Sequence, residues 1–416
     1  MVTGERSSVT LTDIQAASRN LQGVTIHTPL LPAEQLSQDI GARVFYKAEN
    51  TQRAGSFKLR GAYNKIASLS LEERRKGVIA HSAGNHAQGV ALAAQIWNVP
   101  ATVVMPRFAP LAKVKATQRL GAEVILHGDS FDDAGAYAHQ LQQEYGSTYV
   151  HAFNDPLTIA GQGTVGLELA KDLPSVETVV VPVGGGGLIA GIAVALRGLR
   201  RKVRIVGVQA EGCPSLRLSL SAGEPVTVPR AATISDGIAV KRPGDLTLPI
   251  IRQMVDEVVT VDDEETARAI FHILQYSRLV VEGAGAVGVA ALLSGKITIN
   301  PGETVAVILS GGNIDANFLA RIIEQVLVKQ GRYLLIRTSV PDKPGNLAPL
   351  LVHTAESGAN VIDVQHRRAA WQLPLDRVGI EMILEVRDEE HGQHVIDHLE
   401  RCGYHVERFG QRVWPI

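Results

Sequence analysis

The stretch "AGSFKLRGAYNKI" (residues 54–66) places Lys58 between Phe57 and Leu59, with small residues before it and a helical pattern after it. Most lysines lie on solvated surfaces, so an ammonium group between two large apolar neighbours needs a reason. A lysine amine in such a position can act as a nucleophile and hold a carbonyl cofactor as a Schiff base. The alternative is an ordinary lysine at a helix start, and Lys58 alone does not decide between the two.

A second loop, "HSAGNHAQG" (residues 81–89), joins a predicted strand to a predicted helix. Its small residues form a tight turn, and Asn85 and His86 begin the helix. Free backbone N–H groups at a helix start can bind a carboxylate or a phosphate, and the Asn85 amide can donate to a ring hydroxyl. The simpler interpretation is that Asn85 only caps the helix. His81 and His86 lack the spacing of metal ligands.

A third loop, "VPVGGGGLIAG" (residues 181–191), has four consecutive glycines between an apolar strand and an apolar helix. Glycine costs stability in regular elements, whereas bare backbone amides can surround a phosphate. We therefore predict phosphate binding here. Gly185, Gly187 and Ala190 also satisfy the alanine variant of the dinucleotide fingerprint, with Glu211 at a fitting distance. An NAD-dependent oxidoreductase is therefore a competing interpretation.

The fourth loop, "ILSGGNID" (residues 308–315), has Ser310 at the end of a predicted strand. Its hydroxyl could bond a heterocyclic nitrogen, or it could merely cap a helix. A weaker candidate loop, "VEGAGAVG" (residues 281–288), adds Glu282 as a polar contact. The four main loops together supply an amine, a donor to a ring hydroxyl, a phosphate cradle and a partner for a ring nitrogen. Pyridoxal phosphate needs that set, whereas a dinucleotide does not need the lysine.

Strand and helix patterns alternate from about residue 42 to residue 320, which predicts an α/β fold with parallel sheets covered on both faces. Ligands of such sheets bind at the carboxyl ends of the strands. Beyond about residue 329 the order becomes βαββαβ, which fits a small ferredoxin-like module. We expect a catalytic domain over residues 1–328, with a small subdomain at about 52–155 inserted in a larger one, and a separate module over residues 331–416.

Composition limits the class of protein. The 416 residues are 45% hydrophobic, enough for two or three domains. A net charge of −1 shows no excess of basic residues, so no nucleic-acid partner is expected. The two cysteines, Cys213 and Cys402, are far apart, so neither a disulfide framework nor a structural zinc site is expected. No signal peptide or membrane-spanning run is visible, and we expect a cytoplasmic enzyme with no membrane partner.

The segments "GSFKLRGA", "SAGNHAQGVA", "GGGGLIAG", "TISDGIAV" and "LSGGN", in this order, resemble the threonine ammonia-lyases, or threonine dehydratases. These are fold-type II, tryptophan-synthase-β-like pyridoxal phosphate enzymes. The C-terminal "PDKPGNLAPLL" and "ESGANVIDV" resemble a single ACT domain, as in the medium-length members of that family. The resemblance implies β-elimination that converts L-threonine to 2-oxobutanoate and ammonia, with L-serine as a second substrate. It implies a role in isoleucine biosynthesis or threonine catabolism.

The resemblance also implies roles for individual residues. Lys58 forms the Schiff base and takes the α-proton, and Phe57 lies against the cofactor ring. Asn85 bonds the ring hydroxyl, Ser310 meets the pyridine nitrogen, and Gly237 lies beside the cofactor. The implied phosphate contacts are Gly184, Gly185, Gly186, Gly187 and Leu188. The implied contacts of the substrate carboxylate are Ser82, Gly84, Asn85 and His86.

Two positions refine this expectation. Serine racemases have a second acid–base serine where this chain has Ala83, so we predict a lyase with little racemase activity. Related enzymes bind a divalent ion through a glutamate where this chain has Gln209, a neutral and poorer ligand. The sequence therefore does not determine whether a metal is bound. A serine or threo-3-hydroxyaspartate dehydratase and a non-catalytic amino-acid sensor remain alternatives.

The resemblance to an ACT domain suggests control by an amino acid. Such modules pair across subunits and bind amino acids at the interface, and the turn "DKPGN" opens a helix at the corresponding position. We hypothesise allosteric regulation by isoleucine or valine in a homodimer or homotetramer; the alternative is that the module only supports assembly. His391, His394 and His398 share a helix face, which we interpret as a solvated face and not as a metal site.

Overall fold

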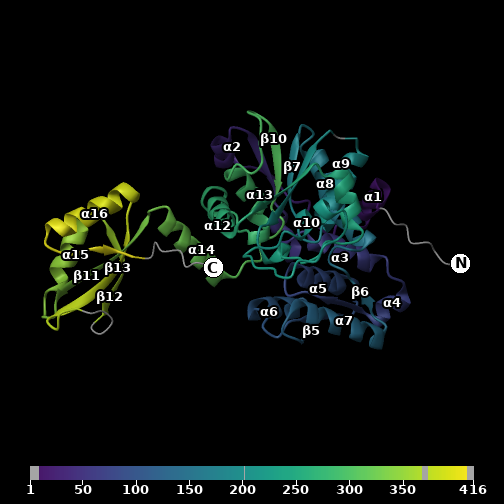
Figure 1. Cartoon of the computed structure of the whole chain (residues 1–416). Coiled ribbons are helices and arrows are strands. Elements are labelled where there is room, and N and C mark those ends of the chain that lie inside the picture. Colours follow the sequence, from purple (N-terminus) through teal and green to yellow (C-terminus); the bar gives the residue numbers. More distant parts are fainter. Residues whose placement is uncertain (1–8, 201, 368–372, 410–416) are drawn as a thin grey trace. The chain divides into compact units, whose positions relative to one another are not determined.

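The computed structural model describes residues 9–200, 202–367 and 373–409 (Figure 1). The chain divides into two compact units between Asp315 and Ala316. This division lies earlier than the boundary expected at residues 328–331. The reason is helix α14 (Ala316–Lys329), which packs against strand β11 (Tyr333–Pro341) and is grouped with the C-terminal unit.

The first unit contains a six-stranded sheet in the order β1-β2-β10-β7-β8-β9. All neighbouring strands are parallel except β1 and β2. Every residue of the central strands β7 and β10 is buried, which explains their unbroken apolar runs. The strands are β1 (Leu30–Pro32), β2 (Arg43–Lys47), β7 (Thr178–Pro182), β8 (Arg204–Ala210), β9 (Glu257–Val261) and β10 (Thr304–Ile308).

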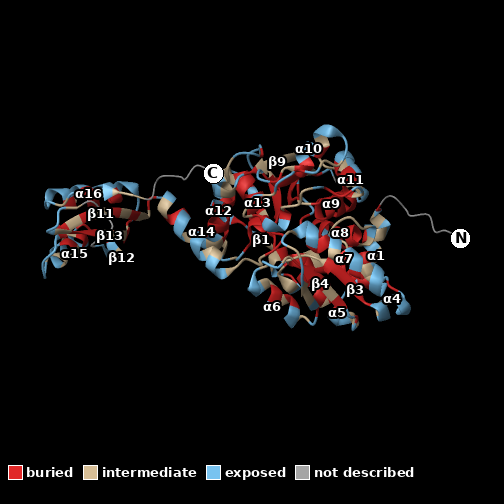
Figure 2. Cartoon of the chain, turned by 60° about the horizontal axis from the view of Figure 1, so that its bottom comes forward, coloured by how far each residue is buried: buried red, intermediate tan, exposed pale blue. Residues whose placement is uncertain are grey.

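Helices cover both faces of this sheet, as Figures 1 and 2 show, and the buried residues gather in the strands and the helix faces on them. Helices α1, α8, α9 and α11 pack together on one face, and α2, α12 and α13 pack on the other. The covering helices are α1 (Leu11–Asn20), α2 (Glu34–Ile40), α8 (Pro156–Asp172), α9 (Gly187–Gly198), α11 (Thr247–Met254), α12 (Asp263–His272) and α13 (Gly283–Leu293). The predicted parallel α/β fold is confirmed.

A second, wholly parallel sheet in the order β5-β4-β3-β6 lies within the range 52–155 that the sequence assigns to an inserted subdomain. Helices α3, α5 and α6 share one apolar core with it, and α7 covers the other face. The elements are β3 (Val78–His81), β4 (Ala101–Met105), β5 (Glu123–Leu126), β6 (Thr148–Tyr149), α3 (Lys58–Ala67), α5 (Asn85–Trp97), α6 (Leu111–Arg119) and α7 (Phe131–Tyr145).

The C-terminal unit has the predicted order βαββαβ after α14. Its antiparallel sheet runs β12-β13-β11-β14, with α15 and α16 side by side on one face (Figure 1). Burial alternates along β11, so one face of the sheet forms the core. The further elements are α15 (Leu347–Glu356), β12 (Asn360–Arg367), β13 (Arg377–Glu385), α16 (Glu389–Arg401) and β14 (Glu407–Arg408).

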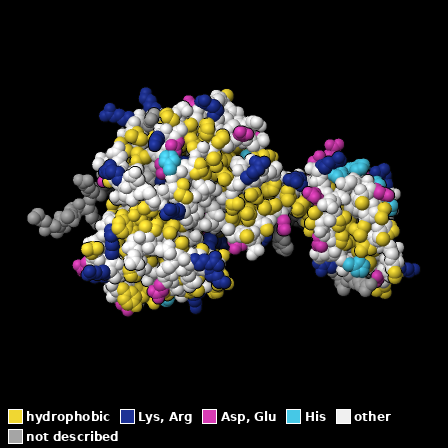
Figure 3. All heavy atoms as spheres, turned by 180° about the vertical axis from the view of Figure 1, so that it is seen from behind, with side chains coloured by type: hydrophobic (Ala, Val, Ile, Leu, Met, Phe, Trp, Pro, Cys, Tyr) yellow, Lys and Arg dark blue, Asp and Glu magenta, His cyan; other side chains and the backbone are white. Residues whose placement is uncertain are grey.

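Short elements complete the described chain. They are α4 (Leu71–Lys76), α10 (Ser215–Ala222), 3₁₀ turns at Glu49–Thr51, Arg53–Gly55 and Asp236–Ile238, and a π turn at Ile273–Ser277. Across the described ranges, no helix combines the length and the apolar character needed to span a membrane. Positive and negative side chains are interspersed on the face that Figure 3 shows, in keeping with a net charge of −1.

Candidate active site

The chain segment before α3 carries Lys58 to the end of strand β10. Ser56 pairs with Gly311 in an isolated antiparallel bridge, and the N–H of Phe57 donates to the carbonyl of Ser310 over 3.2 Å. Helix α3 then begins at Lys58 itself. The lysine loop and the serine loop, far apart in the sequence, are therefore joined by backbone hydrogen bonds.

The amine of Lys58 is directed inward. Its Nζ donates to the carbonyl of Ala152 over 3.0 Å and lies 5.2 Å from the centroid of the Phe57 ring. Burial lowers the pKa of Lys58 to about 8, and the carboxylate of Glu282 opposes that shift. The amine is therefore partly neutral near physiological pH, as a nucleophile or a general base must be.

A buried ion network holds the helix that carries Lys58. The guanidinium of Arg60 bonds both oxygens of Glu49 at 2.8 Å and both oxygens of Glu168 at 2.6 and 3.1 Å. Lys47 pairs with the same Glu168 at 2.7 Å. Arg60 is completely buried. Because Arg60 lies in the first turn of α3, its planar fork fixes the position of that turn. We did not predict this anchor from the sequence.

Asn85 is held in one orientation at the start of α5. Its Nδ2 donates to Glu282 Oε1 over 2.5 Å, and its Oδ1 accepts from Asn313 Nδ2 over 2.7 Å. The N-cap of α5 is Gly84, so the simpler interpretation of Asn85 as a helix cap is wrong. Asn313 was not predicted, whereas Glu282 was a candidate contact and lies at the centre of the group.

Ser310 is buried and its Oγ donates to the carbonyl of Ala284 over 3.3 Å. The next helix begins only at Ala316, so Ser310 is not a helix cap either. A side chain at Gly311 would meet Glu282 Oε1 at 2.4 Å and Asn85 Nδ2 at 2.9 Å. The serine loop therefore passes directly against the Asn85–Glu282 pair.

The tetraglycine loop follows β7 and leads into α9. Gly186 has a φ of +95°, and a side chain there would meet Thr247 Oγ1 at 2.8 Å, so the position requires glycine. The first N–H groups of α9 have no side-chain cap and no intrahelical acceptor. Leu188 packs into the core, which leaves only its backbone for a ligand. A bare cradle of amides at a helix start fits the phosphate of pyridoxal phosphate.

The other predicted residues have distinct surroundings. Ser82 Oγ accepts from the N–H of Gly84 over 3.1 Å and shapes the turn before α5. A side chain at Gly237 would lie 3.4 Å from Glu282 Oε1 and 3.9 Å from Asn85 Nδ2. The structure therefore brings Gly237 beside the same pair of side chains.

The ring of His86 contacts the protein backbone. Its Nε2 contacts the carbonyl of Val150 at 2.7 Å, and its buried Nδ1 has no protein partner. Burial, followed by the charge of Lys58, lowers the pKa of His86 to about 3, so the ring is neutral. Because Nε2 must carry the proton that Val150 accepts, Nδ1 can only accept. A substrate carboxylate could be bound by the backbone N–H of His86 but not by its ring.

One segment was missed entirely. After β6, the carbonyl of Val150 bonds His86 and the carbonyl of Ala152 accepts from Lys58. The ring of Phe153 lies against Gly185, and its Cα and Cβ lie against Gly187. Asn154 Oδ1 accepts from the backbone of Leu246 over 2.9 Å. The segment lies at the carboxyl end of a parallel strand, as the predicted loops do, and that position was the available signal.

Gln209 is buried in β8, and its Oε1 accepts from the N–H of Arg217 over 3.0 Å. Its carbonyl therefore already has a protein donor. Glu211, the acidic residue of the competing dinucleotide interpretation, is exposed.

Known proteins identify the family. The family described as "Pyridoxal-phosphate dependent enzyme" matches residues 21–311. An L-threonine ammonia-lyase of Thermotoga maritima is 52% identical over 402 residues, covering 97% of this chain and 100% of its own. Another, of Geobacter sulfurreducens, is 48% identical over 95% of this chain and 98% of its own. The structure of a threonine deaminase from Solanum lycopersicum superposes with a TM-score of 0.72 at 40% identity, covering 76% of this chain and 87% of that one. The chain therefore belongs to the pyridoxal-phosphate-dependent enzymes and, within them, to the threonine ammonia-lyases.

Proposed function

We propose that the PLP-dependent deamination of L-threonine to 2-oxobutanoate and ammonia is carried out here by Lys58, with Asn85, Ser310 and residues 184–188 holding the cofactor. The observation that carries this assignment is the approach of the lysine, asparagine and serine loops around one half-buried amine whose pKa is lowered to about 8. The dinucleotide alternative has no use for that amine and no support from the relatives.

Each predicted contact has a physical reason. The amides of the tetraglycine loop and of the first turn of α9 would bind the phosphate. Asn85 would donate from Nδ2 to the ring hydroxyl. Ser310 would turn its hydroxyl from the carbonyl of Ala284 to bond the pyridine nitrogen. When bound, pyridoxal phosphate supplies an electron sink that stabilises negative charge at the substrate α-carbon.

Lys58 has two tasks. Its neutral amine would hold the cofactor covalently. The same Nζ, when free, would accept the proton from the α-carbon of threonine. The free N–H groups in the first residues of α5, including that of His86, would bind the substrate carboxylate, whereas the N–H of Gly84 already donates to Ser82 Oγ. Ala83 offers no proton on the opposite face, which favours elimination over racemisation.

Turnover of L-threonine tests the proposal. We expect a yellow protein that forms 2-oxobutanoate, loses its colour on borohydride reduction and carries the reduced label on Lys58. Lys58→Ala should abolish turnover and retain the fold. A label on another lysine, or full activity in Lys58→Ala, would refute the assignment. L-serine measured in parallel decides the substrate preference.

The C-terminal unit supports a regulatory proposal. The turn "DKPGN" leads into α15, where Asn346 makes no side-chain cap. The N–H of Ala348 already bonds the carbonyl of Gly345, so the N–H of Leu347 is the group that could bind an amino-acid carboxylate. We expect isoleucine or valine to change the threonine saturation curve of a homodimeric or homotetrameric enzyme. Removal of residues 331–416 should keep catalysis and remove the response. An unchanged response in the truncated protein would contradict this regulatory role.

A further inference from the structure

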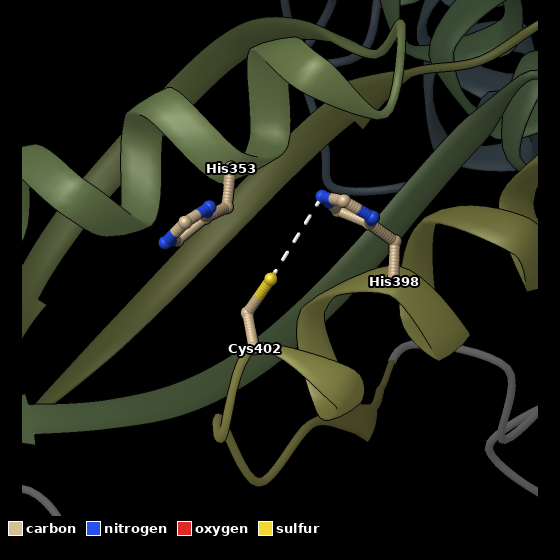
Figure 4. A group of neighbouring side chains, drawn as sticks. All are labelled: His353, His398 and Cys402. Atoms are coloured by element: carbon tan, nitrogen blue, oxygen red, sulfur yellow. Dashed lines mark hydrogen bonds between the residues drawn. The ribbon is translucent and has the colours of Figure 1, made fainter.

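Three side chains with metal-binding atoms face one another in the C-terminal unit (Figure 4). His353 lies in α15, His398 lies in α16, and Cys402 directly follows the last residue of α16. One nitrogen or sulfur atom from each lies within 4.8 Å of the others. Within residues 9–200, 202–367 and 373–409, this is the one such group of three or more.

The backbone brings these donors together. His398 and Cys402 are four residues apart, so they occupy the same helix face, and Cys402 Sγ lies 3.9 Å from His398 Nε2. Below them Leu350 of α15 and Leu399 of α16 are fully buried in the core of the unit. The spacing between the two helices is therefore set by core packing and not by the exposed side chains.

A carboxylate lies next to two of these donors. Glu356 Oε2 lies 3.0 Å from His353 Nδ1 and 3.8 Å from His398 Nε2. In a tetrahedral zinc site, with bonds of about 2.0–2.3 Å, neighbouring ligand atoms are about 3.3–3.8 Å apart. The separations of His398 Nε2 from Cys402 Sγ and from Glu356 Oε2 lie near that range. Glu356 is not among the donors that lie within 4.8 Å of one another, so its side chain would have to rotate toward Cys402 to become the fourth ligand.

We propose that His353, Glu356, His398 and Cys402 form a four-coordinate site for zinc or a similar borderline transition ion. Two imidazoles, a thiolate and a carboxylate are the donor set of zinc and cobalt, not of calcium or magnesium. The thiolate and the carboxylate neutralise the two charges of the ion, and the thiol proton leaves to solvent on binding. Four protein ligands leave no open position, so the ion joins α15 to α16 and takes no part in catalysis.

The three histidines of α16 differ in burial and in their contacts, which the sequence did not show. His391 is buried, with Nδ1 accepting from the N–H of Arg387 and Nε2 bonded to the carbonyl of Ser357, so it has a structural role. His394 is exposed. His398 turns toward α15 and joins the proposed site. The solvated-face interpretation is therefore wrong for His391, which is buried, and agrees with the exposure of His394.

Cobalt titration of the full-length holoenzyme tests the site. We expect one Co²⁺ per chain, with the intense long-wavelength bands of tetrahedral coordination and a thiolate-to-cobalt charge-transfer band in the difference spectrum. Zinc should displace the cobalt. Cys402→Ser should remove the charge-transfer band, and His398→Gln and His353→Gln should weaken binding at least about tenfold.

Matched controls keep the result decisive. His394→Gln changes an exposed histidine of the same helix and should leave cobalt binding unchanged, and Cys213→Ser should leave the charge-transfer band unchanged. Threonine turnover should be unaffected in every variant, which separates this site from the proposed chemistry. Weak octahedral spectra, or a charge-transfer band that persists in Cys402→Ser, would overturn the proposal. If one variant fails to fold, the wild-type cobalt spectrum still shows whether the ion is bound in tetrahedral geometry by a thiolate.

Discussion

Asn85 Nδ2 donates to Glu282 Oε1 over 2.5 Å, and this bond connects the first residue of α5 to the residue before α13. Asn313 Nδ2 donates to Asn85 Oδ1 of the same amide. The Asn85 amide therefore cannot flip and exchange the positions of Nδ2 and Oδ1. Burial, followed by the charge of Asp236, raises the pKa of Glu282 to about 7. We therefore propose that Glu282 is a positioning residue that orients the Asn85 donor.

Glu282→Gln should remove the loss of folding stability that follows ionisation of the buried Glu282 carboxyl. The folded pKa of Glu282 is about 7, above the unfolded value, so the wild type loses stability as pH rises from about 4.3 to 7. Glutamine does not titrate. The unfolding free energy of the variant minus that of the wild type should increase by up to about 3 kcal/mol between pH 5 and pH 8. Urea unfolding at several pH values measures this difference.

The exposed Glu224→Gln serves as the matched control and should show no such trend. A visible spectrum of the holoenzyme that shifts with pH in the wild type but not in Glu282→Gln would support the positioning role. Parallel stability curves for the wild type and Glu282→Gln from pH 5 to pH 8 would contradict it.

Lys58 should limit the rate of cofactor attachment below pH 8. Because burial lowers its pKa to about 8, the reactive neutral amine falls about tenfold per pH unit below that value and saturates above it. We expect the rate at which apoenzyme turns yellow on mixing with pyridoxal phosphate to level off above pH 8.

The Glu282 carboxylate opposes the lowering of the Lys58 pKa. In Glu282→Gln the plateau should therefore begin at a lower pH. A rate that keeps rising up to the pKa of an ordinary lysine, about 10.4, would show that the amine is not desolvated.

Arg60→Ala should destabilise the first unit strongly. It leaves Glu49 buried without its guanidinium partner and removes the bidentate bonds to Glu168, and breaking a buried ion pair costs about 3–5 kcal/mol. Arg60→Lys should recover only part of this loss, because an ammonium group cannot make two parallel bonds to each carboxylate. Chemical unfolding and cofactor affinity are the measurements.

Arg53→Lys, at an exposed position in the preceding turn, is the control and should behave like the wild type.

Gly186→Ala should weaken cofactor binding. The left-handed backbone at φ +95° costs about 1 kcal/mol with a side chain, and the added carbon would also meet Ile251 Cδ1 at 2.7 Å. Gly121→Ala is the matched control, since its φ is +85° but no atom lies within 4 Å of the added carbon. Both variants should lose stability, but only Gly186→Ala should lose affinity for pyridoxal phosphate by tenfold or more. Equal affinities would show that the tetraglycine loop is not the phosphate site.

The sequence determined the elements and the chemical inventory of the site. Alternating apolar strands and helices can satisfy their backbones and bury their faces only as covered parallel sheets. Lys58, Asn85, the four glycines and Ser310 lie at loops that such a fold gathers at the carboxyl ends of strands. These are local signals, because each loop shows its residue types within about ten positions.

Only the tertiary structure determined which residues are hydrogen-bond partners in the site. Asn85 and Asn313 are 228 residues apart and Lys58 and Ala152 are 94 apart, and no periodicity encodes which of many amides or carbonyls will meet. The tautomer of His86 follows from the carbonyl of Val150, and the role of His398 follows from its approach to α15. Such pairings depend on the packing of whole helices and sheets, because side-chain contacts form only after the backbone has been placed.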